Sequence, residues 1–216
     1  MCGVIGFFTT NPDDIQIARL ERLFEQSKIR GLHSFGITIR TLDGELKTFK
    51  SLDLSSLKNY LRNAPPFDTL IGHNRYSTSG DWHDENNNQP IVIPGISVVF
   101  NGIITQATKR EYELALGKKF ITENDGEIFA RKVIDGEDWR AFVSKGRFSF
   151  AGAFMTEKEA FAIRNKNRPL WMSRSPSSMF IASTRDIFMR AGFKAPEEIR
   201  EGQAVPLAKG SLCSSL

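Results

Sequence analysis

Two strand–turn–strand patterns constrain the fold of this chain more than any other feature of the sequence. Residues 34–51, SFGITIRTLDGELKTFKS, form two apolar-rich runs around Asp43-Gly44, and Asp-Gly between such runs is a strong local hairpin signal. Residues 89–104, QPIVIPGISVVFNGII, repeat the pattern around Pro94-Gly95. Because a short turn joins antiparallel neighbours, both segments predict antiparallel sheets.

Helical patterns lie between these hairpins. Residues 11–28 have good helix-start chemistry, since Asn11 can cap and Pro12 suits the first turn, and Ile17, Leu20 and Phe24 then share one face. Further helices are expected at 54–61, 109–116, 126–133, 137–144 and 184–191, and further strands at 149–155, 159–163, 179–182, within 202–207 and from residue 68 onward. Hairpins grouped between paired helices predict an α+β fold, with helices covering the outer faces of antiparallel sheets. The chain has neither a linker nor a repeat, so we expect one domain over residues 1–216.

Composition narrows the class of protein. The chain has 216 residues, of which 40% are hydrophobic and 25% charged, as in ordinary globular proteins. No apolar run approaches the roughly 20 residues that span a bilayer, and the N-terminus lacks signal-peptide character, so we expect no membrane partner. Cys2 and Cys213 stand at opposite ends, which argues against a disulfide framework and favours a reducing cytoplasm.

The net charge of +4 is mildly basic, and the densest basic stretch is RNKNRPLWMSR, residues 164–174. Over the chain as a whole, the basic residues are dispersed and interleaved with Asp and Glu, which makes nucleic acid a poor candidate partner. A solvated hairpin or a docking face for another protein explains the stretch better, and a homo-oligomer is left open.

Cys2 directly follows the initiator methionine, and it is small enough for that methionine to be removed. A cysteine at the mature N-terminus carries its own base, because the α-amine has a pKa of about 7.7–8.0 and is partly neutral at pH 7. The amine can take the thiol proton and leave a thiolate that attacks a carbonyl carbon. On its own, the pattern fits equally a small apolar residue that begins the buried strand GVIGFF.

The segment GHNRYSTSG, residues 72–80, predicts a strand that opens into a polar loop. Arg75 at the strand end, followed by Tyr76, Ser77 and Thr78, places a guanidinium beside hydroxyl groups. This arrangement suits bidentate capture of a carboxylate, although an ion-paired arginine on a polar loop is the alternative. Residues 82–90, WHDENNNQP, are expected to form a polar loop over the same pocket rather than a metal site.

Two further segments carry polar groups at element ends. In FNGII, Asn101 and Gly102 could offer a side-chain amide and a backbone N–H to a developing oxyanion, although Asn-Gly is also a common turn. In ENDGEIF, Asp125 and Glu127 fall at a predicted helix start, where capping is the alternative role. A carboxylate at that position can bind a substrate ammonium, and Asp125 is the candidate.

A thiolate, a carboxylate clamp and an ammonium-binding carboxylate together describe a site for an α-amino acid with a side-chain amide, and L-glutamine fits. The sequence resembles the class II glutamine amidotransferases, whose domain belongs to the N-terminal-nucleophile (Ntn) hydrolases. The resemblance covers nearly the whole chain and rests on segments in family order, which are MCGVIGF, RGLHSFGI, GHNRYSTSG, NNNQP, FNGII, ENDGEIF, FAGAFM and RPLWM…FIAST.

The resemblance implies a four-layer α/β/β/α sandwich with two stacked antiparallel sheets, and no metal or organic cofactor. It also implies a role for each matching residue: Cys2 as the nucleophile, Arg75 as the carboxylate ligand with Tyr76 and Thr78 shaping its pocket, Asn101 and Gly102 as the oxyanion hole, Asp125 as the ammonium ligand, and Arg30 as the residue that orders the terminus.

Four positions depart from the family pattern. His33 replaces a frequent acidic or amide residue, and Ser79 and Phe100 stand where histidine is common. Gly126 stands where threonine is often found. None of these changes removes a predicted catalytic group, but together they argue against assigning the chain to one particular synthase.

The resemblance implies that Cys2 forms a γ-glutamyl thioester with glutamine and releases ammonia, which a separate synthase protein would accept. Two other functions remain open from the sequence. One is an amide or peptide hydrolase for γ-glutamyl compounds without an ammonia acceptor, and the other is a non-catalytic subunit that senses glutamine.

Overall fold

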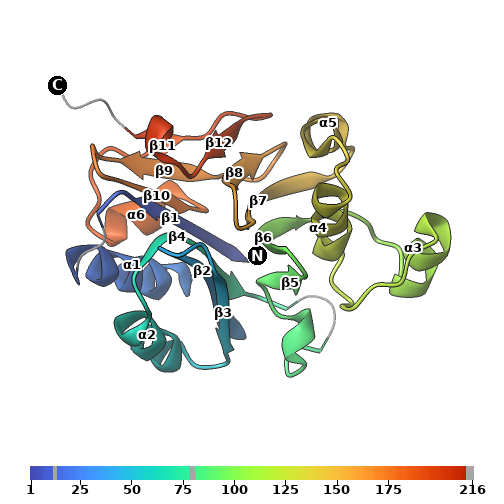
Figure 1. Ribbon diagram of the computed structural model, residues 1–216, viewed down its shortest axis with the longest axis horizontal. Helices are drawn as coiled ribbons and strands as arrows, with labels where there is room; N and C mark the ends of the chain where they lie inside the picture. Colours follow the sequence, from blue (N-terminus) through green and yellow to red (C-terminus); the bar gives the residue numbers. More distant parts are fainter. Residues whose placement is uncertain (12–13, 78–80, 213–216) are drawn as a thin grey trace.

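The computed structural model describes residues 1–11, 14–77 and 81–212, which form two antiparallel sheets with helices on their outer faces (Figure 1). The seven-stranded sheet has the order β11-β9-β10-β1-β4-β2-β3, and the five-stranded sheet has the order β12-β8-β7-β6-β5. The strands of the first sheet are β1 (Gly3–Thr9), β2 (Ser34–Thr41), β3 (Leu46–Ser51), β4 (Phe67–Arg75), β9 (Trp171–Arg174), β10 (Ser178–Ala182) and β11 (Glu197–Glu198). Those of the second are β5 (Ile91–Ile93), β6 (Ile96–Ile103), β7 (Ser149–Met155), β8 (Ala160–Arg164) and β12 (Ala204–Pro206).

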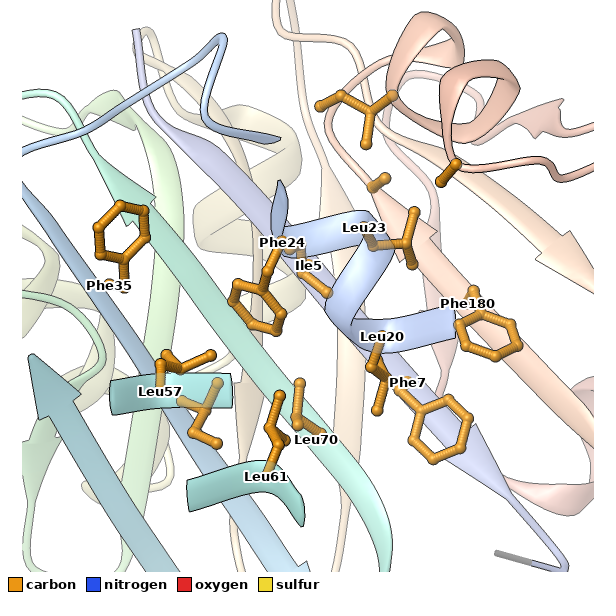
Figure 2. Close-up of a cluster of buried hydrophobic side chains, with 14 of the residues drawn as sticks. Ile5, Phe7, Leu20, Leu23, Phe24, Phe35, Leu57, Leu61, Leu70 and Phe180 are labelled. Carbon is orange, nitrogen blue, oxygen red and sulfur yellow. The ribbon is translucent and has the colours of Figure 1, made fainter. Parts of the chain in front are cut away.

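The period-two alternation of β1 separates two cores. Ile5 and Phe7 point to one face of the sheet, where they join the apolar faces of α1 (Asp14–Ser27), α2 (Leu54–Asn63) and α6 (Arg185–Arg190). Figure 2 shows both side chains among Leu20, Leu23 and Phe24 of α1. Val4 and Phe8 point to the opposite face, where they pack against the second sheet.

Strand β6 alternates in the same way on the second sheet. Val99 belongs to the core between the sheets, whereas Val98 and Phe100 face α4 (Gly126–Ile134) and α5 (Trp139–Lys145) on the outside. The layers therefore follow the order α/β/β/α, which confirms the predicted fold class. Helix α3 (Lys109–Leu116) lies outside these layers and leads into the segment before α4 (Figure 1).

Both predicted hairpins form, and each has glycine in a left-handed conformation at its turn. Gly44 has φ of 90° and Gly95 has φ of 87°, values that L-residues with a side chain rarely adopt. The predicted helices are present with ends shifted by a few residues. The first spans Asp14–Ser27, and Pro12, predicted for its first turn after a cap at Asn11, lies outside the described residues. Strands β9 and β11 were not predicted.

Within the described residues, no helix is both long enough and apolar enough to cross a bilayer.

Candidate active site

Strand register brings the predicted nucleophile and the predicted carboxylate ligand side by side. Gly3 of β1 is paired with Asn74 of β4, so Cys2 lies opposite Arg75 at the end of the next strand. Both side chains fall on the face between the sheets, because they have the parity of Val4 and Ile71 in the inter-sheet core. The N-terminus lies next to β6 of the other sheet (Figure 1).

Three contacts fix Cys2. Its backbone N–H donates to Oδ1 of Asn101 at 3.3 Å, and its Sγ lies 3.6 Å from the carbonyl oxygen of Tyr76. Its own carbonyl accepts from Nε of Arg30 at 3.1 Å. The structure includes Met1, which is 65% exposed, so the Cys2 nitrogen belongs to a peptide bond here and becomes an α-amine once Met1 is removed.

Asn101 carries a buried donor that no described residue uses. Its Oδ1 accepts from Cys2, while its Nδ2 has no hydrogen-bond partner within the described part of the chain, although the residue is only 4% exposed. A buried N–H without a partner is unfavourable unless a ligand or water satisfies it. The amide therefore presents, next to Cys2, a donor that no described residue uses.

The backbone of Gly102 provides a second donor in the same place. Gly102 lies opposite Phe150 of β7, whose N–H and C=O both bond to Asn165 on the far side, at 2.5 and 2.9 Å. Opposed residues of an antiparallel pair either bond to each other or both point away, so the Gly102 N–H points away from β7. Strand β5 begins only at Ile91, opposite Val98, so the N–H of Gly102 is directed beyond the start of β5.

Arg75 is held in a buried setting. The residue is 5% exposed, and its Nη1 donates to Oδ1 of Asn88 at 2.6 Å. Burial lowers the pKa of the guanidinium, and the nearby Cys2 raises it. Tyr76 follows at half exposure, and its ring stacks on His33 with centroids 5.0 Å apart. Thr78, which the sequence places in the same pocket, lies outside the described residues.

Asp125 does not cap α4 with its side chain, so the capping interpretation is wrong. Its Oδ2 instead accepts from the backbone N–H groups of Ile104 and Thr105, at 2.6 and 3.0 Å, directly after β6. Burial raises the pKa of this carboxyl, while the backbone donors lower it. Glu127 is completely buried, and its carboxylate accepts from N–H groups of the loop before α4 and from Arg131. Its contacts therefore hold that loop against the helix.

The structure thus links Cys2, Arg30, Tyr76 and Asn101 by direct contacts, sets Arg75 opposite Cys2, and joins Asp125 to the same end of β6. Among the described residues, no cluster of His, Cys, Asp and Glu could hold a metal ion.

The basic stretch, residues 164–174, is partly neutralised, because Arg164 pairs with Glu198 and Arg174 with Glu197. A groove of about 470 Å³ between β3 and β5 contains none of the predicted site residues.

Sequence reasoning missed the residues that support the site. Asn88 holds Arg75, and Gln89 accepts the Phe100 N–H at 2.6 Å through its Oε1. Both belong to the quoted segment NNNQP, whose run of amides was a visible signal without an assigned role. His33 was noted only as a departure from the family pattern.

Comparisons with known proteins identify the family of the chain. The family model described as "Glutamine amidotransferase domain" matches residues 73–190. A glutamine–fructose-6-phosphate aminotransferase (isomerizing) of Tropheryma whipplei strain Twist is 31% identical over 201 residues, covering 85% of this chain and 32% of that protein. The enzyme of the same name from Gluconobacter oxydans strain 621H is 35% identical over 138 residues, covering 62% of this chain and 22% of that protein. This chain thus spans about a third or less of these curated relatives.

Solved structures share the fold. An allosteric regulatory enzyme of purine biosynthesis superposes with a TM-score of 0.76 at 23% identity, over 97% of this chain and 48% of that one. The glutamine phosphoribosylpyrophosphate amidotransferase of B. subtilis superposes with a TM-score of 0.66 at 24% identity, over 93% of this chain and 45% of that one. A glutamine aminotransferase class-II domain protein of Silicibacter pomeroyi superposes with a TM-score of 0.63 at 12% identity, over 97% of this chain and 96% of that one.

The family match covers more than half of the chain, and the ordered motifs and the four layers agree with it, so this chain belongs to the class II glutamine amidotransferase domain family of the Ntn type.

Proposed function

We propose that residues 1–216 form one glutaminase domain that hydrolyses the side-chain amide of L-glutamine with Cys2 as its nucleophile. The observation that carries the proposal is the junction of Cys2 and Asn101. The nitrogen that becomes the α-amine lies 3.3 Å from Asn101 Oδ1, and the other end of the same amide is a buried donor with no partner among the described residues.

Substrate binding follows from the charges around this junction. The guanidinium of Arg75 would receive the α-carboxylate, because it is always protonated and matches a carboxylate in shape. Asp125 would receive the α-ammonium, and Tyr76 and Thr78 would border the pocket. Arg30 donates to the Cys2 carbonyl and would keep the new terminus in place after Met1 leaves.

The reaction divides into two displacements at the amide carbon. The α-amine takes the thiol proton, and Cys2 Sγ forms a bond to the carbon while Asn101 Nδ2 and the Gly102 N–H stabilise the oxyanion. The C–N bond breaks, the amine returns its proton to the leaving nitrogen, and ammonia departs from a γ-glutamyl thioester. Water, deprotonated by the amine, then attacks the thioester and releases glutamate and the thiol.

Ammonia released into water at pH 7 becomes ammonium, which is a poor nucleophile. We therefore propose that a separate synthase protein accepts the ammonia. The described residues are taken up by the two sheets and their helices, so a module for the acceptor lies outside them. Full glutaminase activity of the isolated chain, combined with purification from its native cells without a second protein, would contradict this part.

The decisive experiment is intact mass spectrometry after treatment with 6-diazo-5-oxonorleucine, a glutamine-like electrophile. We expect loss of Met1 and one adduct in the wild type. Cys213→Ala is a matched control, because Cys213 is the other of the two cysteines, and it should still form the adduct. Cys2→Ala should form none and should release no glutamate from glutamine.

Three outcomes would overturn the assignment: retention of Met1, an adduct on Cys213, or glutamine binding without glutamate release, as expected of a sensor. Faster turnover of γ-glutamyl dipeptides than of glutamine would instead identify a γ-glutamyl hydrolase.

A further inference from the structure

His33 lies next to the predicted carboxylate ligand and has no role in the mechanism above. It follows Gly31, which approaches the exit of β4 so closely that an added Cβ would lie 2.3 Å from the carbonyl carbon of Arg75. The His33 N–H donates to the carbonyl oxygen of Arg75 at 2.9 Å. The backbone of residues 31–33 is therefore packed directly against the point where Arg75 leaves the sheet.

The His33 ring continues this contact beyond Arg75. Its Nδ1 lies 2.9 Å from the backbone nitrogen of Ser77. A backbone N–H can only donate, so Nδ1 is the acceptor of this hydrogen bond. Two aromatic rings also stack with the imidazole, Tyr76 at 5.0 Å and Trp82 at 5.5 Å between centroids.

Trp82 connects the ring to the side chain of Arg75. The Trp82 carbonyl accepts from Nδ2 of Asn88 at 2.7 Å, and Oδ1 of the same amide accepts from Arg75 Nη1 at 2.6 Å. His33 thus acts on Arg75 along two routes, through the backbone of Ser77 and through Trp82 and Asn88. Asn88 is 1% exposed, so its amide cannot turn to other partners without breaking both bonds.

We propose that His33 is a positioning residue, whose imidazole holds Tyr76, Ser77 and Trp82 in place so that Arg75 is held ready for the α-carboxylate of the substrate. We call His33 with its contacts to Ser77, Tyr76 and Trp82 the His33 clasp. The inference rests on the proposed function, because it assumes that Arg75 binds that carboxylate.

The two properties of the ring can be separated by substitution. His33→Phe keeps an aromatic ring for stacking but removes the Nδ1 acceptor to which the Ser77 N–H donates. His33→Asn loses the stacking, but its Oδ1 occupies the place of Nδ1 and can accept the same N–H. Lys158→Asn is a control for an asparagine introduced elsewhere, because Lys158 is exposed and lies between β7 and β8 of the other sheet.

Steady-state kinetics with glutamine should show a KM about tenfold higher for His33→Phe, with kcat within about twofold of the wild type, since loss of the His33–Ser77 hydrogen bond loosens the backbone that follows Arg75 and so disturbs binding of the carboxylate. His33→Asn should recover most of the lost affinity, and Lys158→Asn should match the wild type. The same assays with 4-aminobutanamide, which lacks the carboxylate, should give similar kcat/KM for wild type and His33→Phe. A merely structural defect would lower kcat/KM equally for both substrates.

Hydrogen exchange of the Ser77 amide tests the clasp without any turnover. We expect protection in the wild type and His33→Asn and its loss in His33→Phe. Wild-type KM in His33→Phe, equal defects in His33→Phe and His33→Asn, or unchanged Ser77 protection would each overturn the clasp. Absence of glutaminase activity in the wild type itself would contradict the proposed function instead, and the exchange data would still decide on the clasp.

Discussion

At the scale of single residues, Asn101 gives the sharpest test of the oxyanion hole. Its Oδ1 holds the Cys2 nitrogen, and its Nδ2 is the buried donor without a described partner. Asn101→Ala should lower kcat about 10²–10³-fold with little change in KM, because the donor acts on charge that develops only in the transition state. Stopped assays of glutamate release would measure both constants.

Asn101→Asp distinguishes the role of the amide oxygen, which holds the Cys2 nitrogen, from that of the amide nitrogen, which is the proposed donor to the oxyanion. It keeps an oxygen for the Cys2 nitrogen and removes the donor, so its kcat should fall at least as far as that of Asn101→Ala. Wild-type kcat in Asn101→Asp would show that the amide serves only to hold the N-terminus.

The sequence indicated Cys2, Arg75, Asn101 and Asp125 because each stands in a short motif at the end of an apolar strand or the start of a helix. It did not indicate Asn88 or the Ser77 contact of His33, because these bonds join segments 13 and 44 residues apart. A side chain's partner across such distances depends on the packed structure. The capping role considered for Asp125 was wrong for the same reason, because its carboxylate accepts the N–H of Ile104, directly after β6, and not an N–H of α4.

At the scale of elements, two departures from the family pattern meet in one contact. An added Cβ on Gly126, the first residue of α4, would lie 2.2 Å from Cε1 of Phe100 on β6. The ring of Phe100 is buried and stacks on Phe150. The larger residue at 100 therefore requires the smaller one at 126, and the two positions set the spacing between β6 and α4.

Gly126→Ala should lower the free energy of unfolding by about 1–3 kcal/mol through overpacking. In Phe100→Leu, which shortens the opposing side chain, the same substitution should cost less, with a coupling of about 1 kcal/mol in a double-mutant cycle by urea denaturation. Gly210→Ala is the control, because a Cβ there meets nothing within 4 Å, and it should stay within about 0.5 kcal/mol of wild type. Simple additivity of the two changes would refute the contact.

Elements with strong local signals were predicted well. The hairpins around Gly44 and Gly95 and most helices have turn or cap chemistry that acts over a few residues; for example, Asp53 caps α2 by accepting the Ser56 N–H at 2.9 Å. Strand β9 spans only Trp171–Arg174 and β11 only Glu197–Glu198. Such short segments carry too little periodicity to be recognised, and they become strands through pairing with β10 and with each other.

At the scale of the whole molecule, strand order is the part that local patterns could not provide. Strand β1 lies between β10 and β4, so residues 178–182 from near the end of the chain pair with residues 5–9. The sequence patterns predicted antiparallel sheets with outer helices, whereas the four-layer arrangement was expected only from the family resemblance. Pairing over such separations is decided by which apolar faces can be buried together, and that is a property of the complete fold.

His73 connects the two sheets and should make global stability depend on pH. Its Nε2 lies 3.2 Å from the Phe100 carbonyl of β6, and the residue is 0% exposed. Burial, and secondarily the positive charge of Arg75, lower the pKa of His73 to about 3, against the smaller raising effect of the Phe100 contact. An unfolded histidine takes up a proton near pH 6.5, so between about pH 6.5 and pH 3 the unfolded chain binds more protons and the free energy of unfolding falls as the pH is lowered.

At 1.36 kcal/mol per pH unit, the contribution of His73 should fall by about 2 kcal/mol between pH 6.5 and pH 5. Urea denaturation at both pH values would measure this loss in the wild type. His73→Asn removes the titrating group, so it should lose about 2 kcal/mol less than the wild type over the same interval, even if it is less stable at pH 6.5. His83→Asn, which removes an exposed histidine, should keep the wild-type dependence. If His73→Asn loses as much stability as the wild type, the imidazole between the sheets does not govern the acid response, and the carboxylates of the folded chain must account for it.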